Sequence, residues 1–278
     1  ASVGGESGGH PSILDDYVRE APSPQLAVDL FTGQWSSSLP PELGVAAGRV
    51  PLFDDPRIHW VVERLGGVDD LRVLELGPLE AGHTAMLERA GASVVAIEAN
   101  TRAYLKCLVV KELLGLARSR FLLGDFGTYL RDTDDTFDLV LASGVLYHAS
   151  DPLGLLERIA RVAPAVAIWT HYFDPEVVEA DPESRRRFTA PTERASTHGV
   201  DVTLHPRDYL ESLAWSGFCG GPEHFARWME RDDLLAVLRA LGYTDIEVLY
   251  DDRTNPNGAC IMLLARRSAS SDVGGTAR

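Results

Sequence analysis

The segment Arg72–Thr84, RVLELGPLEAGHT, decides the fold of this chain of 278 residues. Its first half, Arg72–Leu76, is an apolar run typical of a buried strand, and Gly77 with Pro78 interrupts that run. From His83 onward the apolar residues recur at helical spacing. The segment therefore predicts a β-turn-α unit. In α/β sheets, ligands bind beyond the carboxyl ends of the strands, where such turns lie.

The rest of the chain repeats this alternation of strand and helix. Six further strands are predicted, at Ser93–Ile97, Arg120–Leu123, Phe137–Ala142, Val166–Thr170, Asp245–Tyr250 and Cys260–Ala265. The main helices are predicted at Asp54–Leu65, Arg102–Leu116, Pro152–Val162 and Arg231–Leu241. This pattern predicts an α/β fold with a Rossmann-like, doubly wound sheet of seven strands. The sheet is mostly parallel and ends in an antiparallel C-terminal hairpin strand.

The chain is predicted to form one core with additions. Residues 1–53 form an N-terminal extension and a candidate lid, in which Phe31 and Trp35 either fill an apolar seam or cover a ligand pocket. Residues 54–267 form the core, and about 171–229 form an inserted substrate cap rich in prolines, charges and aromatic residues. The Gly- and Ser-rich residues 1–12 and 268–278 are predicted to be mobile tails.

Composition restricts the possible partners. The net charge of −15 argues against passive binding to nucleic acid or a membrane surface, since such binding depends on clustered Lys and Arg. Cys107, Cys219 and Cys260 are scattered, which predicts neither a disulfide framework nor a metal site and favours a reducing, cytoplasmic setting. No apolar run is long enough to span a bilayer, and residues 1–12 lack the pattern of a signal peptide. The oligomeric state is left open.

The turn after the first strand differs from a dinucleotide-binding turn. The fingerprint G-x-G-x-x-G needs a middle glycine so that the backbone can approach a pyrophosphate. In the run Gly77–Gly82 that position is Leu79, and the carboxylates of Glu75 and Glu80 are close in sequence. Carboxylates repel a pyrophosphate but attract a ligand that bears an ammonium and a sulfonium group. The charge near the turn therefore points to S-adenosylmethionine.

Two later strand ends extend this predicted site. Glu98 ends the second strand, where a carboxylate can accept hydrogen bonds from both ribose hydroxyls; the alternative is a solvated residue before a helix. Asp125 and Phe126 follow the third strand and offer an acceptor and an aromatic face for adenine. The alternative for this pair is a helix N-cap followed by a core phenylalanine.

The tracts LELGPLEAGHT, AIEAN, LLGDF and FDLVLASGVLYH resemble the successive motifs of class I S-adenosylmethionine-dependent methyltransferases. The resemblance implies a final antiparallel strand inserted between its neighbours, with S-adenosyl-L-methionine as cofactor and S-adenosyl-L-homocysteine as product. The cofactor-binding residues that it implies are Glu75, Gly77, Pro78, Gly82, Glu98, Ala99, Asp125, Phe126, Ser143 and Gly144. The glycine turn departs from the family pattern because its glycines are farther apart.

The tract GVLYHASDPLGLL also resembles a motif of the tRNA wobble-uridine carboxymethyltransferases and related methyltransferases. The acidity of the chain argues against a tRNA substrate. We therefore expect a methyltransferase that acts on a small molecule, of the kind used in secondary metabolism. An RNA-modifying (carboxy)methyltransferase is the alternative, and a nucleotide-dependent oxidoreductase or a non-catalytic cofactor-binding module is a third hypothesis.

Methyl transfer from a sulfonium depends mostly on alignment, and a base is needed only when the acceptor loses a proton. His148, His171 and Tyr172 follow the fourth and fifth strands and are the candidate catalytic residues; the alternative for each histidine is a structural role. The expected transfer, to oxygen, nitrogen or carbon, is independent of metal. The candidate walls of an acceptor pocket in the insertion are Trp215, Phe218, Glu223, His224, Phe225 and Trp228. Arg185–Arg187 reads as a salt-bridged surface or as a site for an anionic acceptor.

Overall fold

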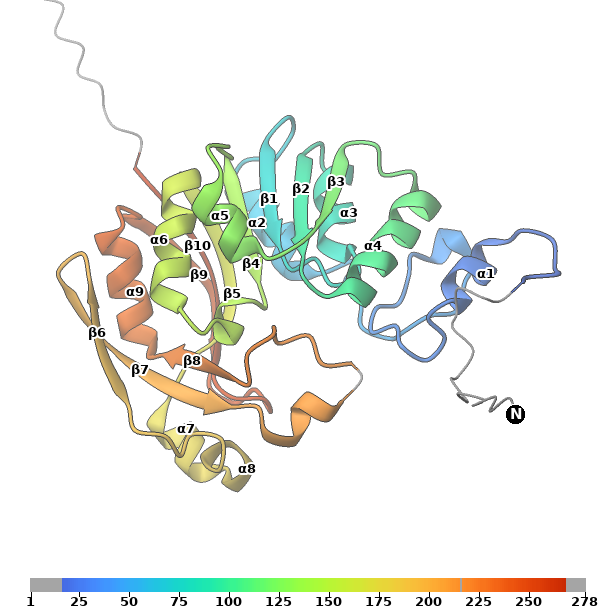
Figure 1. The fold of residues 1–278 in the computed structure, drawn as a ribbon. Coiled ribbons are helices and arrows are strands. Elements are labelled where there is room, and N and C mark those ends of the chain that lie inside the picture. Colours follow the sequence, from blue (N-terminus) through green and yellow to red (C-terminus); the bar gives the residue numbers. More distant parts are fainter. Residues whose placement is uncertain (1–16, 216, 269–278) are drawn as a thin grey trace, which may run out of the picture.

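The computed structural model describes residues 17–215 and 217–268, and a central sheet of seven strands runs through it (Figure 1). The strand order is β3-β2-β1-β4-β5-β10-β9, in which β10 is antiparallel to both neighbours and the pairs among β1 to β5 are parallel. The strands are β1 (Arg72–Leu76), β2 (Ser93–Glu98), β3 (Ser119–Leu123), β4 (Leu139–Ser143), β5 (Ala165–His171), β9 (Asp245–Asp252) and β10 (Cys260–Arg266). The predicted fold is confirmed, including the last strand inserted between its neighbours.

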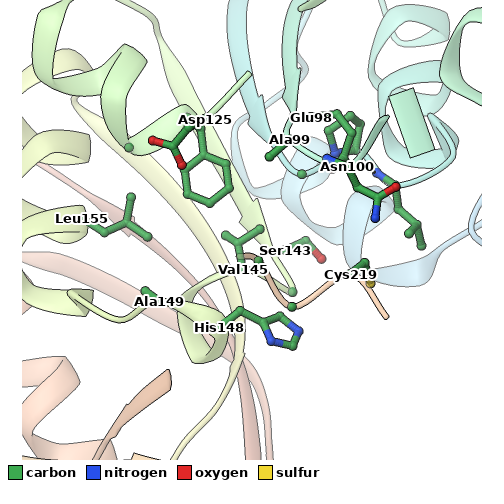
Figure 2. Close-up of a pocket in the computed structure, with 18 of the residues that line it drawn as sticks. Glu98, Ala99, Asn100, Asp125, Ser143, Val145, His148, Ala149, Leu155 and Cys219 are labelled. Atoms are coloured by element: carbon green, nitrogen blue, oxygen red, sulfur yellow. Dashed lines mark hydrogen bonds between the residues drawn. The ribbon is translucent and has the colours of Figure 1, made fainter. Parts of the chain in front are cut away.

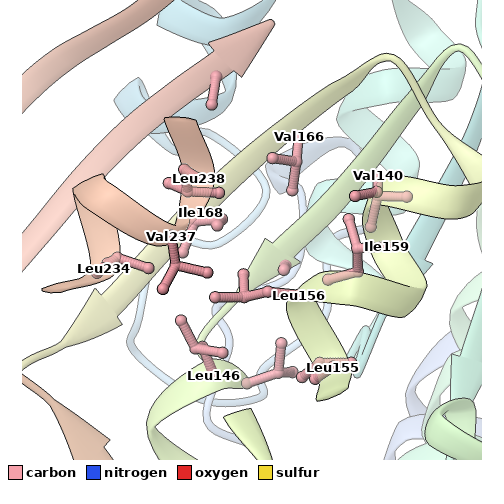
Figure 3. Packing of buried hydrophobic residues seen from close by; sticks show 14 of the residues in the cluster. Val140, Leu146, Leu155, Leu156, Ile159, Val166, Ile168, Leu234, Val237 and Leu238 are labelled. Atoms are coloured by element: carbon pink, nitrogen blue, oxygen red, sulfur yellow. The ribbon is translucent and has the colours of Figure 1, made fainter. Parts of the chain in front are cut away.

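Helices cover both faces of this sheet. On one face pack α5 (Phe126–Asp132), α6 (Pro152–Val162) and α9 (Arg231–Ala240), and on the other pack α2 (Pro56–Arg64), α3 (Gly82–Arg89) and α4 (Thr101–Leu114). Figure 3 shows Leu156 and Ile159 of α6 with Val237 of α9 against the strand residues Val140 and Ile168. Strands covered on both faces are apolar at nearly every position, which explains why they were readable in the sequence.

Short polar side chains end the strand-to-helix connections. Asp55, Asn100, Asp125 and Asp151 each accept a hydrogen bond from a backbone N–H in the first turn of the helix that follows. Such N-caps satisfy backbone donors that have no partner within the helix. Because Asn100 and Asp125 follow β2 and β3 directly, the caps also place polar groups at the carboxyl edge of the sheet.

The segment between β5 and α9 forms a second sheet of three antiparallel strands, in the order β6-β7-β8. Its elements are α7 (Pro175–Ala180), α8 (Pro182–Arg185), β6 (Glu193–Thr197), β7 (Val200–Asp208), the 3₁₀ helix η4 (Leu210–Ala214) and β8 (Phe225–Met229). Val202, Leu204 and Met229 pack on the core that includes α9. The sequence pattern predicts no strands in this segment, because β6, β7 and β8 are partly polar and the segment contains many prolines and charged residues.

The N-terminal extension packs against α4 through the helix α1 (Pro24–Asp29) and the residues that follow it (Figure 1). Phe31 and Trp35 are buried in the core on the α4 side of the sheet, and the Trp35 indole Nε1 donates to the Val28 carbonyl at 2.8 Å. The 3₁₀ helix η2 (Pro41–Leu43) follows. These aromatic residues therefore fill a seam between the extension and the sheet.

The predicted mobile tails lie outside the described residues, except for Ser268. Among residues 17–215 and 217–268, every helix is too short or too polar to cross a membrane.

Candidate functional site

A cavity of about 880 Å³ lies at the carboxyl ends of the parallel strands (Figure 2). Its walls come from the turn after β1, the end of β2, the residues after β3 and β4, the loop 218–223 of the insertion, and α2. This size is within the usual range for small-molecule sites. The lining residues that the sequence analysis selected as cofactor-binding are Gly77, Pro78, Gly82, Glu98, Ala99, Asp125, Phe126, Ser143 and Gly144.

The turn after β1 has an unusual backbone. Gly77, Leu79 and Ala81 all adopt left-handed conformations, with φ of 64°, 55° and 63°. Left-handed backbone is costly for residues with a side chain, so the surrounding contacts must hold it in place. One such contact is the Leu79 amide, which donates to Glu98 Oε2 at 3.1 Å. A Cβ on Gly82 would lie 2.5 Å from the Leu52 carbonyl oxygen, so glycine is required where the extension crosses α3.

Glu98 is almost fully buried at the end of β2, yet its carboxylate lines the cavity. Oε2 accepts from the Leu79 amide and Oε1 accepts from the Asn100 amide at 2.8 Å. Burial raises the pKa of Glu98 above its ordinary value, while the backbone donors of Asn100 and Leu79 act in the opposite direction. A carboxylate has about four lone-pair positions, and the Leu79, Asn100 and Ala99 amides leave acceptor capacity for a ligand hydroxyl.

Asp125 and Phe126 lie on another wall of the cavity. Asp125 Oδ1 accepts from the Thr128 amide at 2.6 Å, so Asp125 is the N-cap of α5. The capping role and the ligand role are compatible, because capping uses one carboxylate oxygen. The half-buried Phe126 ring also packs against the main core. Figure 2 shows Asp125 and Glu98 on separate walls, with Ser143 and Val145 below them in the view.

Two carboxylates that the sequence analysis placed beside the ligand do not line the cavity. Glu75 is buried beneath the turn and accepts from the Thr84 hydroxyl, and burial raises its pKa. Glu80 faces the N-terminal extension, where it pairs with Lys106 Nζ at 2.7 Å and accepts from the Ser37 amide at 2.7 Å. The expectation that Glu80 forms part of a cradle for a cation is therefore wrong, because Lys106 already neutralises its charge.

His148 lies at the cavity, on the 3₁₀ helix η3 (Leu146–His148) that follows β4. Its Nδ1 is 2.7 Å from the Tyr209 hydroxyl. Burial, reinforced by the positive charge of Arg207 and by His171, lowers the pKa of His148 to about 3. The imidazole is therefore neutral at physiological pH, and it is a much weaker base than an ordinary histidine.

His171 and Tyr172 are not brought to this cavity. His171 Nδ1 is 2.9 Å from the Gly258 carbonyl oxygen, and its ring stacks on Trp228 with centroids 5.4 Å apart. The Tyr172 hydroxyl donates to Asp251 at 2.6 Å. Both side chains pack beside β9 and β10, since β10 pairs with the end of β5. The expectation that they face a methyl acceptor is not met.

The cavity also contains a polar cluster that the sequence analysis missed. Arg57 and His83 both line the cavity, and both bond to Asp55: Arg57 Nε lies 3.0 Å and His83 Nε2 lies 2.9 Å from Asp55 Oδ2. Burial alone would raise the pKa of Asp55, but hydrogen bonds from His83 and Arg57 outweigh it and lower the pKa well below its usual range. The Arg57 guanidinium also lies 4.8 Å from the centroid of the Trp169 ring. In the sequence, Asp55 could be placed only at the start of the predicted helix Asp54–Leu65.

The insertion contributes one loop to the cavity, at residues 218–223. Phe218 and Glu223 line the cavity as predicted for walls, together with Cys219, Gly220, Gly221 and Pro222. The other predicted wall residues do not line it: Trp215 is 65% exposed, Trp228 packs on His171, and His224 and Phe225 contact each other. The run Arg185–Arg187 forms ion pairs with Glu179, Glu183 and Glu211.

In the described part of the chain, no group of three or more His, Cys, Asp and Glu side chains is arranged to hold a metal ion.

Comparison with known proteins gives a family match and structural neighbours. Residues 74–165 match the family model described as a methyltransferase domain. The N-terminal domain of EvdMO1 with SAH bound has a TM-score of 0.64 and 24% identity, over 88% of this chain and 95% of that one. The same domain in the presence of SAH and D-fucose has a TM-score of 0.63 at the same identity and coverage.

A more distant neighbour is the SAH-bound magnesium protoporphyrin IX methyltransferase from Synechocystis PCC 6803. Its TM-score is 0.50 and its identity 14%, over 77% of this chain and 81% of that one. A search of curated protein sequences gave no match. Residues 74–165 are therefore similar to a methyltransferase domain, and these neighbours share the fold of the chain.

Proposed function

We propose that the methyltransferase domain of this chain transfers the methyl group of S-adenosylmethionine to a small molecule bound in the same cavity. The domain match supports the reaction class and its cofactor. The observation that carries the assignment to this cavity is Glu98, a buried carboxylate that ends β2 and keeps free acceptor positions toward the cavity. Such a group is suited to the two hydroxyls of a ribose.

The residues around the cavity fit the other parts of the cofactor. Asp125 offers the acceptor and Phe126 the aromatic face that an adenine requires. Gly77 and Gly82 line the cavity where the methionine part would lie, and Ser143 with Gly144 would lie beside the sulfonium. When bound, the cofactor supplies a methyl group that is already activated for transfer.

The charged residues that we propose for the methionine end of the cofactor site are not Glu75 and Glu80, which the sequence suggested. We assign Arg57 to the carboxylate of the methionine part, since its Nη1 makes no hydrogen bond within the described residues and its side chain lines the cavity. Asp55 holds Arg57 and His83 together and fixes their orientation. A guanidinium held rigidly by a carboxylate loses little freedom when a second anion binds.

Replacing Arg57 with glutamine is expected to weaken binding of S-adenosylhomocysteine about tenfold, the loss typical of one hydrogen bond to a charged group. Isothermal titration calorimetry measures this directly. The matched control is Arg131→Gln, because Arg131 also lines the cavity but is exposed and pairs with Asp132. Equal affinities for the two variants would remove Arg57 from the cofactor site.

The chain contributes alignment more than proton chemistry to this reaction. Tyr147, Trp169 and Phe218 form apolar walls that exclude water from the reacting atoms. The low pKa of His148 keeps its imidazole uncharged beside a cationic cofactor, so the two groups do not repel each other. In-line transfer then depends on holding the acceptor atom against the methyl group, which is the largest contribution that a protein makes to such a step.

A small-molecule acceptor is proposed because the acidic chain, with a net charge of −15, is poorly suited to bind RNA. The neighbours are compatible with this: one is a magnesium protoporphyrin IX methyltransferase, and the other was crystallised in the presence of D-fucose. The acceptor end of the cavity has aromatic walls, which suit a compact organic molecule.

Calorimetry with three ligands tests the proposed function. We expect S-adenosylmethionine and S-adenosylhomocysteine to bind and NAD not to bind, since Leu79 occupies the position where a pyrophosphate needs glycine. Binding of NAD without either adenosyl ligand would contradict the proposal. Retention on RNA with a steep dependence on salt would favour the RNA-modifying alternative. A metabolite screen that detects S-adenosylhomocysteine release then identifies the acceptor.

A further inference from the structure

Tyr209 connects His148 to the neighbouring loop 218–223, which also lines the cavity. It follows β7 directly and is only 2% exposed. Its hydroxyl oxygen lies 2.7 Å from His148 Nδ1 and 3.3 Å from the carbonyl oxygen of Gly220. Both of these partners line the cavity, whereas Tyr209 stands behind them.

One hydroxyl hydrogen has to serve these two contacts. The Gly220 carbonyl can only accept a hydrogen bond, while a histidine nitrogen can donate or accept. Both contacts are satisfied when Tyr209 donates to Gly220 and His148 Nδ1–H donates to Tyr209. Burial raises the pKa of Tyr209, so the hydroxyl keeps its hydrogen and this arrangement persists.

This arrangement determines what the other nitrogen of the ring can do. A neutral imidazole with hydrogen on Nδ1 carries a lone pair on Nε2. His148 Nε2 makes no hydrogen bond among residues 17–215 and 217–268, and the residue lines the cavity (Figure 2). The nitrogen is therefore available to accept a hydrogen bond from a bound molecule.

We propose that Tyr209 is a positioning residue that holds His148 in the Nδ1–H tautomer, so that Nε2 selects a methyl acceptor bearing a hydroxyl or an amine. Selection of the acceptor rests on the proposed function, whereas the tautomer does not. A hydroxyl or amine that donates to Nε2 turns its own lone pair toward the methyl group. As that lone pair bonds to the methyl carbon, the carbon–sulfur bond would break and release neutral S-adenosylhomocysteine. The proton that the acceptor donated would pass to Nε2 and then to solvent. A carbon acceptor has no such hydrogen to donate, so the site favours transfer to oxygen or nitrogen.

Loop 218–223 has a glycine where its backbone approaches the His148 ring. A Cβ on Gly220 would lie 2.9 Å from His148 Nδ1, so only glycine lets the loop backbone approach the ring. The Tyr209 ring packs on Phe218 at 4.8 Å between centroids, and the Tyr209 amide donates to the His224 carbonyl at 3.0 Å. Tyr209 thus contacts the loop near both of its ends as well as at Gly220.

Nuclear magnetic resonance of the protein with ¹⁵N-labelled histidine tests the tautomer, with His148→Gln used to assign the signals. We expect a protonated Nδ1 and an unprotonated Nε2 for His148 in the unmodified protein, and loss of this fixed tautomer in Tyr209→Phe. Tyr243→Phe is the control, because it removes another buried hydroxyl, which donates to the Ala163 carbonyl far along the chain. A protonated Nε2 in the unmodified protein overturns the proposal, and this spectrum decides the matter even if Tyr209→Phe fails to fold.

Phenol and anisole, added to the protein saturated with S-adenosylhomocysteine, test the choice of acceptor. Phenol can donate a hydrogen bond, and we expect it to shift the Nε2 signal of His148. Anisole has the same ring without the donor and should leave the signal unchanged. Equal shifts, or none from either compound, would overturn the selection of a hydroxyl or amine. The preceding titration with S-adenosylhomocysteine separates this failure from a failure of the proposed function, because loss of that binding would reject the function alone.

Discussion

Replacing Lys106 with methionine is expected to lower the free energy of unfolding by about 3–5 kcal/mol, the range for removing one partner of a buried ion pair. Lys106 and Glu80 have side chains that are 7% and 0% exposed, and their charged atoms are 2.7 Å apart. Methionine keeps the packing but leaves the Glu80 carboxylate buried with only backbone donors from Ser36 and Ser37. Chemical denaturation followed by circular dichroism measures the loss.

Two further variants test the reason for this effect. Lys111→Met is the matched control, because Lys111 lies on the same helix, donates to the Ser119 carbonyl and forms no ion pair within the described residues, so its loss leaves no carboxylate there unpaired. The double variant Lys106→Met with Glu80→Gln is expected to recover part of the lost stability, since no unpaired charge remains. A loss below about 1 kcal/mol in Lys106→Met, within the range of an exposed pair, would contradict the buried-pair account.

Removal of the Glu98 carboxylate should have the largest effect on cofactor binding. Glu98→Ala is expected to weaken binding of S-adenosylhomocysteine by roughly 1.5–3 kcal/mol, the contribution of hydrogen bonds to a charged group. This corresponds to a rise in the dissociation constant of about ten- to one-hundred-fold. The loss has two causes, because the variant removes both the ribose acceptor and the partner that holds the Leu79 amide in its left-handed turn.

Glu223→Ala is the control for this measurement, since Glu223 lines the same cavity from an exposed position on the loop. Calorimetry of both variants shows whether the loss of affinity is specific to the Glu98 carboxylate or follows from removing any negative charge at the cavity. An unchanged affinity in Glu98→Ala would remove Glu98 from the cofactor site.

The fold was predictable because the main sheet is covered on both faces. Its strands are therefore continuous apolar runs that end at glycine or acidic residues, as at Gly77, Glu98 and Asp125. The second sheet was not predictable in the same way. Strand β7 contains a proline and three polar residues at His205, Pro206, Arg207 and Asp208, so it lacks the apolar pattern of a buried strand. It is nevertheless paired on both sides.

The cofactor-side residues that could be read from the sequence share one property. Each lies at or shortly after the end of a parallel strand, and the carboxyl ends of parallel strands meet at one edge of a sheet. The candidate catalytic residues reach the cavity less consistently. His148 reaches the cavity, but β10 pairs with the end of β5 and draws His171 and Tyr172 into packing beside β9 and β10.

The sequence by itself determined the order of strands, the turn after β1 and the positions of Glu98 and Asp125, because these depend on local apolar pattern and on chain direction. The tertiary structure alone decided how charge is distributed around that turn. Glu80 appeared to face a cationic ligand, but Lys106, which is 26 residues later in the chain, neutralises it on the far side of the turn. Arg57, His83 and Tyr209 enter the site or support it through contacts between distant segments. Such contacts leave no periodic signal in a sequence, since a side chain's partner is set by how the elements pack.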